Sequence, residues 1–127
     1  MLAFPQAVQI FLAAEPTDMR KGFDGLAARV LAHGYDVFSG HLFVFISRRR
    51  DRAKILSWQR GGFVLWYKRL ERGRFRLPRI ADDARTVELD SGQLAMLLDG
   101  VDLKHVRRNC AWKPPKASSG IDTRSQV

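Results

Sequence analysis

Twelve of the 22 lysine and arginine residues in this chain lie between positions 48 and 79. Only Asp51 and Glu71 oppose them there, so this quarter of the sequence carries a net charge of +10, against +9 for the whole chain. Ten of the twelve are arginines. Guanidinium groups bind phosphate oxygens through two parallel hydrogen bonds and are less strongly hydrated than ammonium groups. The pattern therefore indicates a surface for a polyanion, with nucleic acid as the first candidate.

We predict that the basic side chains of this region bind nucleic acid, and DNA in the first place. The predicted contacts are Arg48, Arg49, Arg50, Arg52, Lys54, Lys68, Arg69, Arg72, Arg74 and Arg76. The alternative is a solvated surface whose charge is neutralised by carboxylates from the C-terminal third of the chain. The acidic residues available for this are Asp82, Asp83, Asp99 and Asp102.

The carboxylates, histidines and single cysteine do not show a catalytic spacing. Metal-dependent strand transfer requires two or three carboxylates that converge on metal ions, whereas Asp18 and Asp24 would lie on different faces of one helix. A zinc site requires closely paired ligands, a spacing that is missing from His33, His41, His105 and Cys110. We therefore expect no catalytic residue, no metal site and no cofactor. The alternative, a nuclease, predicts magnesium-dependent cleavage of DNA.

Aromatic residues lie between the basic ones. Trp58, Trp66, Tyr67 and Phe75 could stack on unpaired bases, which contributes roughly 1–3 kcal/mol per base in single-strand binding. Tryptophans in the sheet of a small domain more often pack in the core. Core packing is therefore the favoured interpretation for Trp58 and Trp66, and base stacking is the alternative.

The N-terminal third predicts one strand and one helix. Apolar and other residues alternate over 8–13, with the period of two that is typical of a strand. Apolar residues then recur at helical spacing. We expect this helix to have Thr17 or Asp18 as its N-cap and to end at positions 33–34.

The rest of the chain predicts a β-rich half. Expected strands cover 41–46, 54–59, 63–67, 74–77 and 86–89, with turns at 47–52, 61–62 and 72–73. A short helix should follow, in which Asp90 and Gln93 form a capping box and Gly100 ends the helix. The fold class is then α+β, an antiparallel meander of four to six strands. One helix follows the first strand and one short helix lies near the C-terminus.

This organisation places the basic residues at strand ends and turns on one rim of the sheet. We expect a single α+β domain over 1–106 and a basic, flexible tail over 107–127. The sequence has one cysteine, no apolar run of membrane-spanning length and no secretory leader at its start. We therefore expect a cytoplasmic protein without a membrane partner, associated with the nucleoid if it binds DNA.

Several segments carry a family resemblance. Residues 17–27 read TDMRKGFDGLA, and 38–45, 48–49, 54–58 and 66–75 read FSGHLFVF, RR, KILSW and WYKRLERGRF. Over roughly residues 8–102 this series resembles the accessory proteins called TnpB, or Orf2-like proteins, of IS66-type insertion sequences. The chain departs from the family pattern at 59–61, where an acidic residue would be expected after the tryptophan.

The resemblance implies a non-enzymatic accessory protein in transposition, encoded beside a separate transposase. Its expected partners are nucleic acid and the transposase of the same element, while the sequence predicts no oligomeric state. The alternative function is a protein-interaction module that docks the transposase through the first helix without contacting DNA. The residues expected to make that contact are Arg20, Lys21, Phe23 and Asp24.

Overall fold

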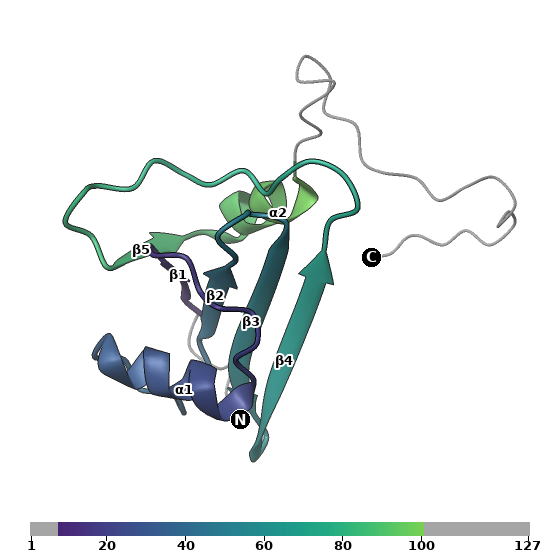
Figure 1. Ribbon diagram of the computed structural model, residues 1–127. Coiled ribbons are helices and arrows are strands. Elements are labelled where there is room, and N and C mark those ends of the chain that lie inside the picture. Colours follow the sequence, from purple (N-terminus) through teal and green to yellow (C-terminus); the bar gives the residue numbers. More distant parts are fainter. Residues whose placement is uncertain (1–7, 101–127) are drawn as a thin grey trace, which may run out of the picture.

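A computed structural model describes residues 8–100 of the chain as a five-stranded sheet with one helix on each face (Figure 1). The elements are β1 (Ile10–Ala13), α1 (Phe23–Ala32), β2 (Leu42–Ile46), β3 (Arg52–Gln59), β4 (Gly62–Arg69), β5 (Thr86–Leu89) and α2 (Ser91–Asp99). The strands are ordered β4-β3-β2-β1-β5. The predicted α+β class and the positions of both helices in the chain are confirmed.

The sheet is mixed, so the prediction of a purely antiparallel meander is wrong at one strand pair. β1 and β2 run parallel, with Phe11 opposite Phe43. The chain between them crosses the sheet through α1, as a parallel connection requires. The other neighbours are antiparallel, and β5 returns to pair with β1 at the far edge. The β-rich half therefore does not continue as a simple series of hairpins.

Two apolar cores lie on the two faces of the sheet, because successive side chains of a strand point to opposite faces. One core packs Val44 and Ile55 against Leu97 of α2. The other packs Phe43 and Leu56 against α1. This alternation holds the two helices on opposite faces of the sheet.

The first helix begins at Phe23, several residues later than predicted, and its N-cap is Gly22. Thr17 and Asp18 do not cap it. The amide of Thr17 instead donates to the carbonyl of Ile46 (2.9 Å), and the Asp18 carboxylate accepts from the amide of Arg20 (2.9 Å). The expected capping residues therefore fix a loop that crosses toward the end of β2 before the helix starts.

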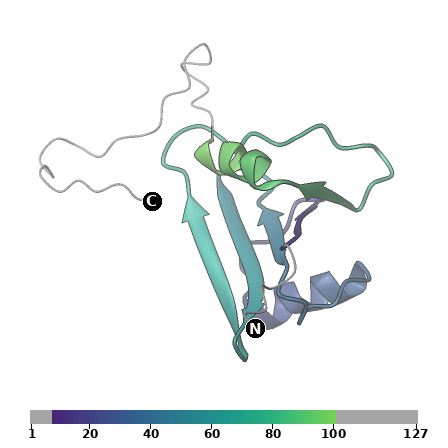
Figure 2. The same ribbon diagram turned by 180° about the vertical axis from the view of Figure 1, so that it is seen from behind.

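The predicted strand over 74–77 does not form. Phe75 is 1% exposed in the core beside α2, and its amide donates to the carbonyl of Arg50 (2.7 Å). Residues 70–85 therefore leave the sheet as a long connection, which passes over one end of the sheet toward β5 (Figures 1 and 2). Consequently, β4 is an edge strand.

The remaining local predictions fare better. The β3–β4 turn consists of Arg60 and Gly61, both with positive φ, as a two-residue hairpin turn requires, one residue earlier than expected. The capping box of Asp90 and Gln93 is confirmed.

The expected domain boundary at 106 and the tail lie outside the described residues. Among the helices of residues 8–100, neither has the length and apolar character needed to cross a membrane.

Candidate nucleic-acid interface

The β2–β3 turn and the chain that follows β4 meet at one end of the sheet. Arg52 of β3 lies directly opposite Arg69 of β4. Just beyond this pair, the amide of Leu70 donates to the carbonyl of Asp51 (2.7 Å). The amide of Phe75 donates to the carbonyl of Arg50 (2.7 Å). These backbone bonds join two segments that are about twenty residues apart in the sequence, and both are rich in arginine.

Seven exposed arginines therefore share this end of the sheet, which we call the basic end: Arg48, Arg49, Arg50, Arg52, Arg69, Arg72 and Arg74. Arg69 pairs with Glu71 (3.0 Å). Within residues 8–100, Arg48, Arg49, Arg50, Arg52 and Arg74 form no ion pair. Like charges held this close repel one another, so an anionic partner at this end would relieve the repulsion.

The β2–β3 turn is held by Ser47, which is 9% exposed. Its hydroxyl donates to the Asp51 carboxylate (3.2 Å) and accepts from the amide of Arg52 (3.1 Å). The amide of Arg50 donates to the carbonyl of Ser47 (2.9 Å). Arg50 itself has a φ of 63°, a left-handed conformation that is unfavourable for residues other than glycine. Such local strain is typical of positions that the surrounding structure holds for a function.

Lys54 was predicted as a nucleic-acid contact, and the structure places it elsewhere. Lys54 is 7% exposed. Its ammonium donates to the carbonyls of Met19 and Lys21 (2.8 Å each) and lies 4.6 Å from the ring centre of Tyr67. Lys54 therefore anchors the loop before α1 to the sheet and does not contribute to the exposed charge.

Two other predicted contacts also turn away from the basic end. The ammonium of Lys68 donates to the carbonyl of Leu98 in the last turn of α2 (2.8 Å), where a cation interacts favourably with the helix dipole. Arg76 lines a hollow against α2 that includes Leu89 and Gln93. Arg60, the cation in the β3–β4 turn, lies at the opposite end of the sheet.

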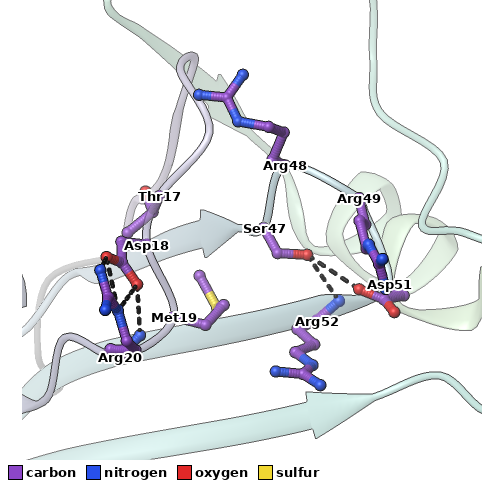
Figure 3. A pocket seen from close by; sticks show the side chains of 9 residues that line it. All are labelled: Thr17, Asp18, Met19, Arg20, Ser47, Arg48, Arg49, Asp51 and Arg52. Atoms are coloured by element: carbon purple, nitrogen blue, oxygen red, sulfur yellow. Dashed lines mark hydrogen bonds and ion pairs between the residues drawn. The ribbon is translucent and has the colours of Figure 1, made fainter.

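An open hollow of about 410 Å³ separates the loop before α1 from the β2–β3 turn (Figure 3). Its walls are formed by Thr17, Asp18, Met19, Arg20, Ser47, Arg48, Arg49, Asp51 and Arg52. Four arginines and two aspartates line it, so the net formal charge of the lining is positive. Sequence reasoning missed this hollow, because the loop and the turn are about thirty residues apart.

The two aspartates of the hollow already have partners. Asp18 forms an ion pair with Arg20 (2.7 Å) and accepts further bonds from its Nε (3.1 Å) and backbone amide (2.9 Å). These hydrogen bonds to Arg20 hold the pKa of the Asp18 carboxyl far below its usual range. The same pair raises the pKa of Arg20.

Thr17 differs from the other residues of the hollow because its hydroxyl is buried without a hydrogen-bond partner among the described residues. The residue is 3% exposed. A buried hydroxyl without a partner costs about 1–3 kcal/mol. Sequence reasoning could not predict this, because Thr17 is by type an ordinary helix-capping residue.

The aromatic residues divide between the two ends of the hairpin. Trp58 packs edge-on against Phe38 and Phe63, at ring distances of 4.9 Å. Trp66 is 40% exposed on the edge strand, so the interpretation of it as a core residue is wrong. Tyr67 is exposed beside the basic end, where it lines a second open hollow of about 350 Å³ with Arg52, Arg69 and Glu71.

The residues predicted to contact a protein partner lie around the start of α1 and not along it. Arg20 and Lys21 precede the helix, and Phe23 is its first residue. Phe23 is 47% exposed, and Asp24 is exposed in the first turn. Over the described range of 8–100, no three His, Cys, Asp or Glu side chains come together in a way that could hold a metal ion.

The fold and the site define a small α+β protein in which exposed arginines from distant segments gather at one end of a mixed sheet. A family model described as "IS66 Orf2 like protein" matches residues 8–108. The chain belongs to this family of IS66 insertion-sequence accessory proteins, and the resemblance seen in the sequence is confirmed.

Two relatives from Sinorhizobium fredii (strain NBRC 101917 / NGR234) are similar over nearly their whole length. The uncharacterized protein y4jC is 32% identical over 119 residues, which cover 93% of this chain and 100% of the relative. The uncharacterized protein y4hO is 38% identical over 118 residues, which cover 91% of this chain and 98% of the relative. No solved structure matches the chain significantly.

Proposed function

We propose that this accessory protein binds nucleic acid, and DNA in particular, through the basic end, and that it thereby assists the transposase of its element. The single observation that carries the proposal is the gathering of seven exposed arginines from the β2–β3 turn and the segment after β4. Membership of the IS66 family supplies the context, because transposition acts on DNA.

The geometry favours contacts to the phosphate backbone. Arginines in turns and at strand ends reach outward, and guanidinium groups bind phosphate oxygens without regard to base sequence. Neither helix contributes an arginine to the basic end, so no arginine-bearing helix is offered to the major groove in the manner of the common DNA-reading motifs. The exposed ring of Tyr67 lines an open hollow together with Arg52 and Arg69 and offers a surface on which an unpaired base can stack.

The second candidate function is docking of the transposase, and the exposure of Phe23 favours it. An apolar ring that is 47% exposed at the start of α1, flanked by Lys21 and Asp24, has the mixed character of a protein contact. Lys21, Phe23 and Asp24 are not among the arginines of the basic end, so both functions can coexist in one molecule.

A salt series tests the proposal. If about five arginines of the basic end contact duplex phosphates, the logarithm of the association constant should fall with the logarithm of salt concentration at a slope of about −4 to −5. The measurement is fluorescence anisotropy with labelled DNA from the element ends, beside scrambled DNA of equal length. Equal affinities for the two DNAs are expected for backbone contacts. Negligible binding at low salt would contradict the proposal and leave docking through Phe23 as the function to pursue.

A further inference from the structure

We infer that the outer edge of β4 pairs with the same edge of a second copy of this chain, antiparallel and across a two-fold axis at Leu65. In the part of the chain that the structure describes, β3 is the only strand that pairs with β4. Figures 1 and 2 show β4 at the border of the sheet. An edge strand presents amides and carbonyls to any strand that approaches it. This pairing does not depend on the proposed DNA binding.

β4 lacks the features that usually protect a sheet edge, which are short strands, prolines, bulges and charged side chains. The strand has eight residues, and its register with β3 runs without a bulge from Gly62 to Arg69. It contains no proline, and residues 62–67 carry no charge. β5, at the other edge, has only four residues, and Glu88 is one of them. Of the two edges, β4 is therefore the one suited to pairing.

The hydrogen bonds of the hairpin determine which residues of β4 face outward. Gln59 and Gly62 flank the two-residue turn, and the residues that flank such a turn form a bonded pair. Bonded pairs then alternate along the two strands. The other end of the hairpin agrees, because the amide of Leu70 donates to the carbonyl of Asp51 (2.7 Å). The even-numbered residues of β4 therefore bond to β3. The amides and carbonyls of the odd-numbered residues point away from it: Phe63, Leu65, Tyr67 and Arg69.

A two-fold axis at Leu65 gives these outward groups partners. It places Leu65 opposite its own copy, and Phe63 opposite Tyr67 of the second copy. On the other face of the sheet, the same register sets Val64 opposite Trp66. These two residues are 46% and 40% exposed, so each would cover apolar surface of the other, and such cross-strand pairs stabilise a sheet.

The charges along β4 favour a second copy in this orientation. The cations Lys68 and Arg69 lie at one end of the strand only. Antiparallel pairing keeps the cationic ends of the two copies roughly 27 Å apart, since a strand rises about 3.4 Å per residue. Parallel pairing would put them side by side, where like charges repel. In the antiparallel register Lys68 lies opposite Gly62. Arg69, which already pairs with Glu71 (3.0 Å), lies opposite Gly61.

Sedimentation velocity of the full chain over a concentration series tests the pairing. The wild type should shift from one copy to two as concentration rises. Val64→Lys should weaken the dimer by about ten-fold or more, because each substitution occurs twice in a two-fold interface and sets a cation against an apolar side chain. Leu31→Lys is the matched control, since Leu31 is 58% exposed on α1, and it should dimerise like the wild type. A monomeric wild type at millimolar concentration would overturn the inference, and so would undiminished dimerisation of Val64→Lys.

A mixture of Val64→Lys and Trp66→Glu tests the register. The proposed register brings the two substituted positions together, cation against carboxylate, and keeps one wild-type pair of Val64 with Trp66. The mixed dimer should therefore be more stable than either homodimer. An axis shifted to Trp66 would set Val64 opposite Lys68, so the absence of any gain on mixing would refute an axis at Leu65.

Hydrogen exchange measured by NMR identifies what lies along the edge. The amides of Phe63, Leu65 and Tyr67 should become protected as concentration rises, whereas those of Val64 and Trp66 should be protected at all concentrations by β3. Outward amides that exchange fast throughout would contradict the pairing. Protection that does not change with concentration, in a protein that stays a monomer, would assign the edge to another segment of the same chain and would also overturn the inference.

Discussion

The two lysines of residues 48–79 have roles that the arginines of the basic end do not share. Lys54 and Lys68 each turn their ammonium onto backbone carbonyls, those of Met19 and Lys21 in one case and that of Leu98 in the other. An ammonium is a compact charge with three donors, suited to converging carbonyls, whereas the planar guanidinium fork suits phosphate. Along 48–79, both lysines therefore hold the fold, whereas the arginines of the basic end are exposed.

Lys54→Met tests this division. The variant loses two charge-assisted hydrogen bonds, so we expect a loss of about 1–3 kcal/mol in the free energy of unfolding. It should also speed hydrogen exchange at the amides of Thr17, Arg20 and Lys21, which NMR resolves individually.

Lys68→Met is the control for that measurement. It removes an equivalent bond to α2 and should leave exchange in the loop before α1 unchanged. Equal exchange rates in that loop for the wild type and Lys54→Met would show that Lys54 does not anchor it.

At the scale of the elements, the basic end depends on how α2 meets the chain after β4. A Cβ added to Gly100, just after α2, would lie 2.7 Å from the side chain of Leu70 and 3.3 Å from the carbonyl oxygen of Arg74. Gly100 also has φ 76° and ψ 175°, a region that is essentially restricted to glycine. The end of α2 therefore helps to fix the segment that carries Arg72 and Arg74.

Gly100→Ala should destabilise the fold by about 1–3 kcal/mol, because it combines an unfavourable backbone conformation with a steric overlap. Chemical denaturation measures the change. Gly34→Ala is the control, since Gly34 has φ 87° and nothing within 4 Å of an added Cβ. The cost at Gly100 should exceed that at Gly34. Equal costs would mean that the contact with Leu70 and Arg74 is unimportant.

Local signals in the sequence predicted most of the elements. The apolar run over 41–46, the hairpin that follows and the capping box of Asp90 depend on neighbouring residues, and all three are present. The start of α1 and the segment 74–77 could not be predicted, because distant groups decide them. The amide of Thr17 donates to the carbonyl of Ile46, and the amide of Phe75 donates to the carbonyl of Arg50 at the basic end.

The site was predictable only as a concentration of charge. The excess of arginine in 48–79 can be read from the sequence, but the sequence did not show that Lys54 is buried, that Arg60 lies at the far end, or that Thr17 lines the same hollow as Arg48. Each of these depends on contacts between residues that are far apart in the chain.

At the scale of the whole molecule, the distribution of charge is the central feature. The excess positive charge lies mainly in residues 48–79, and the fold brings seven of its arginines to one end of the sheet. Arg29 of α1 and Arg60 lie away from that end. A protein that merely attracts polyanions through its net charge would not depend on which arginine is removed.

The most direct measurement compares DNA affinity in two double variants of equal net charge. Arg48→Ala with Arg49→Ala removes two cations of the basic end, and Arg29→Ala with Arg60→Ala removes two cations elsewhere. We expect the first variant to lose about ten-fold or more in affinity and the magnitude of its salt slope to fall by about 2, whereas the second stays close to the wild type. Equal losses in the two variants would contradict the assignment of DNA binding to the basic end.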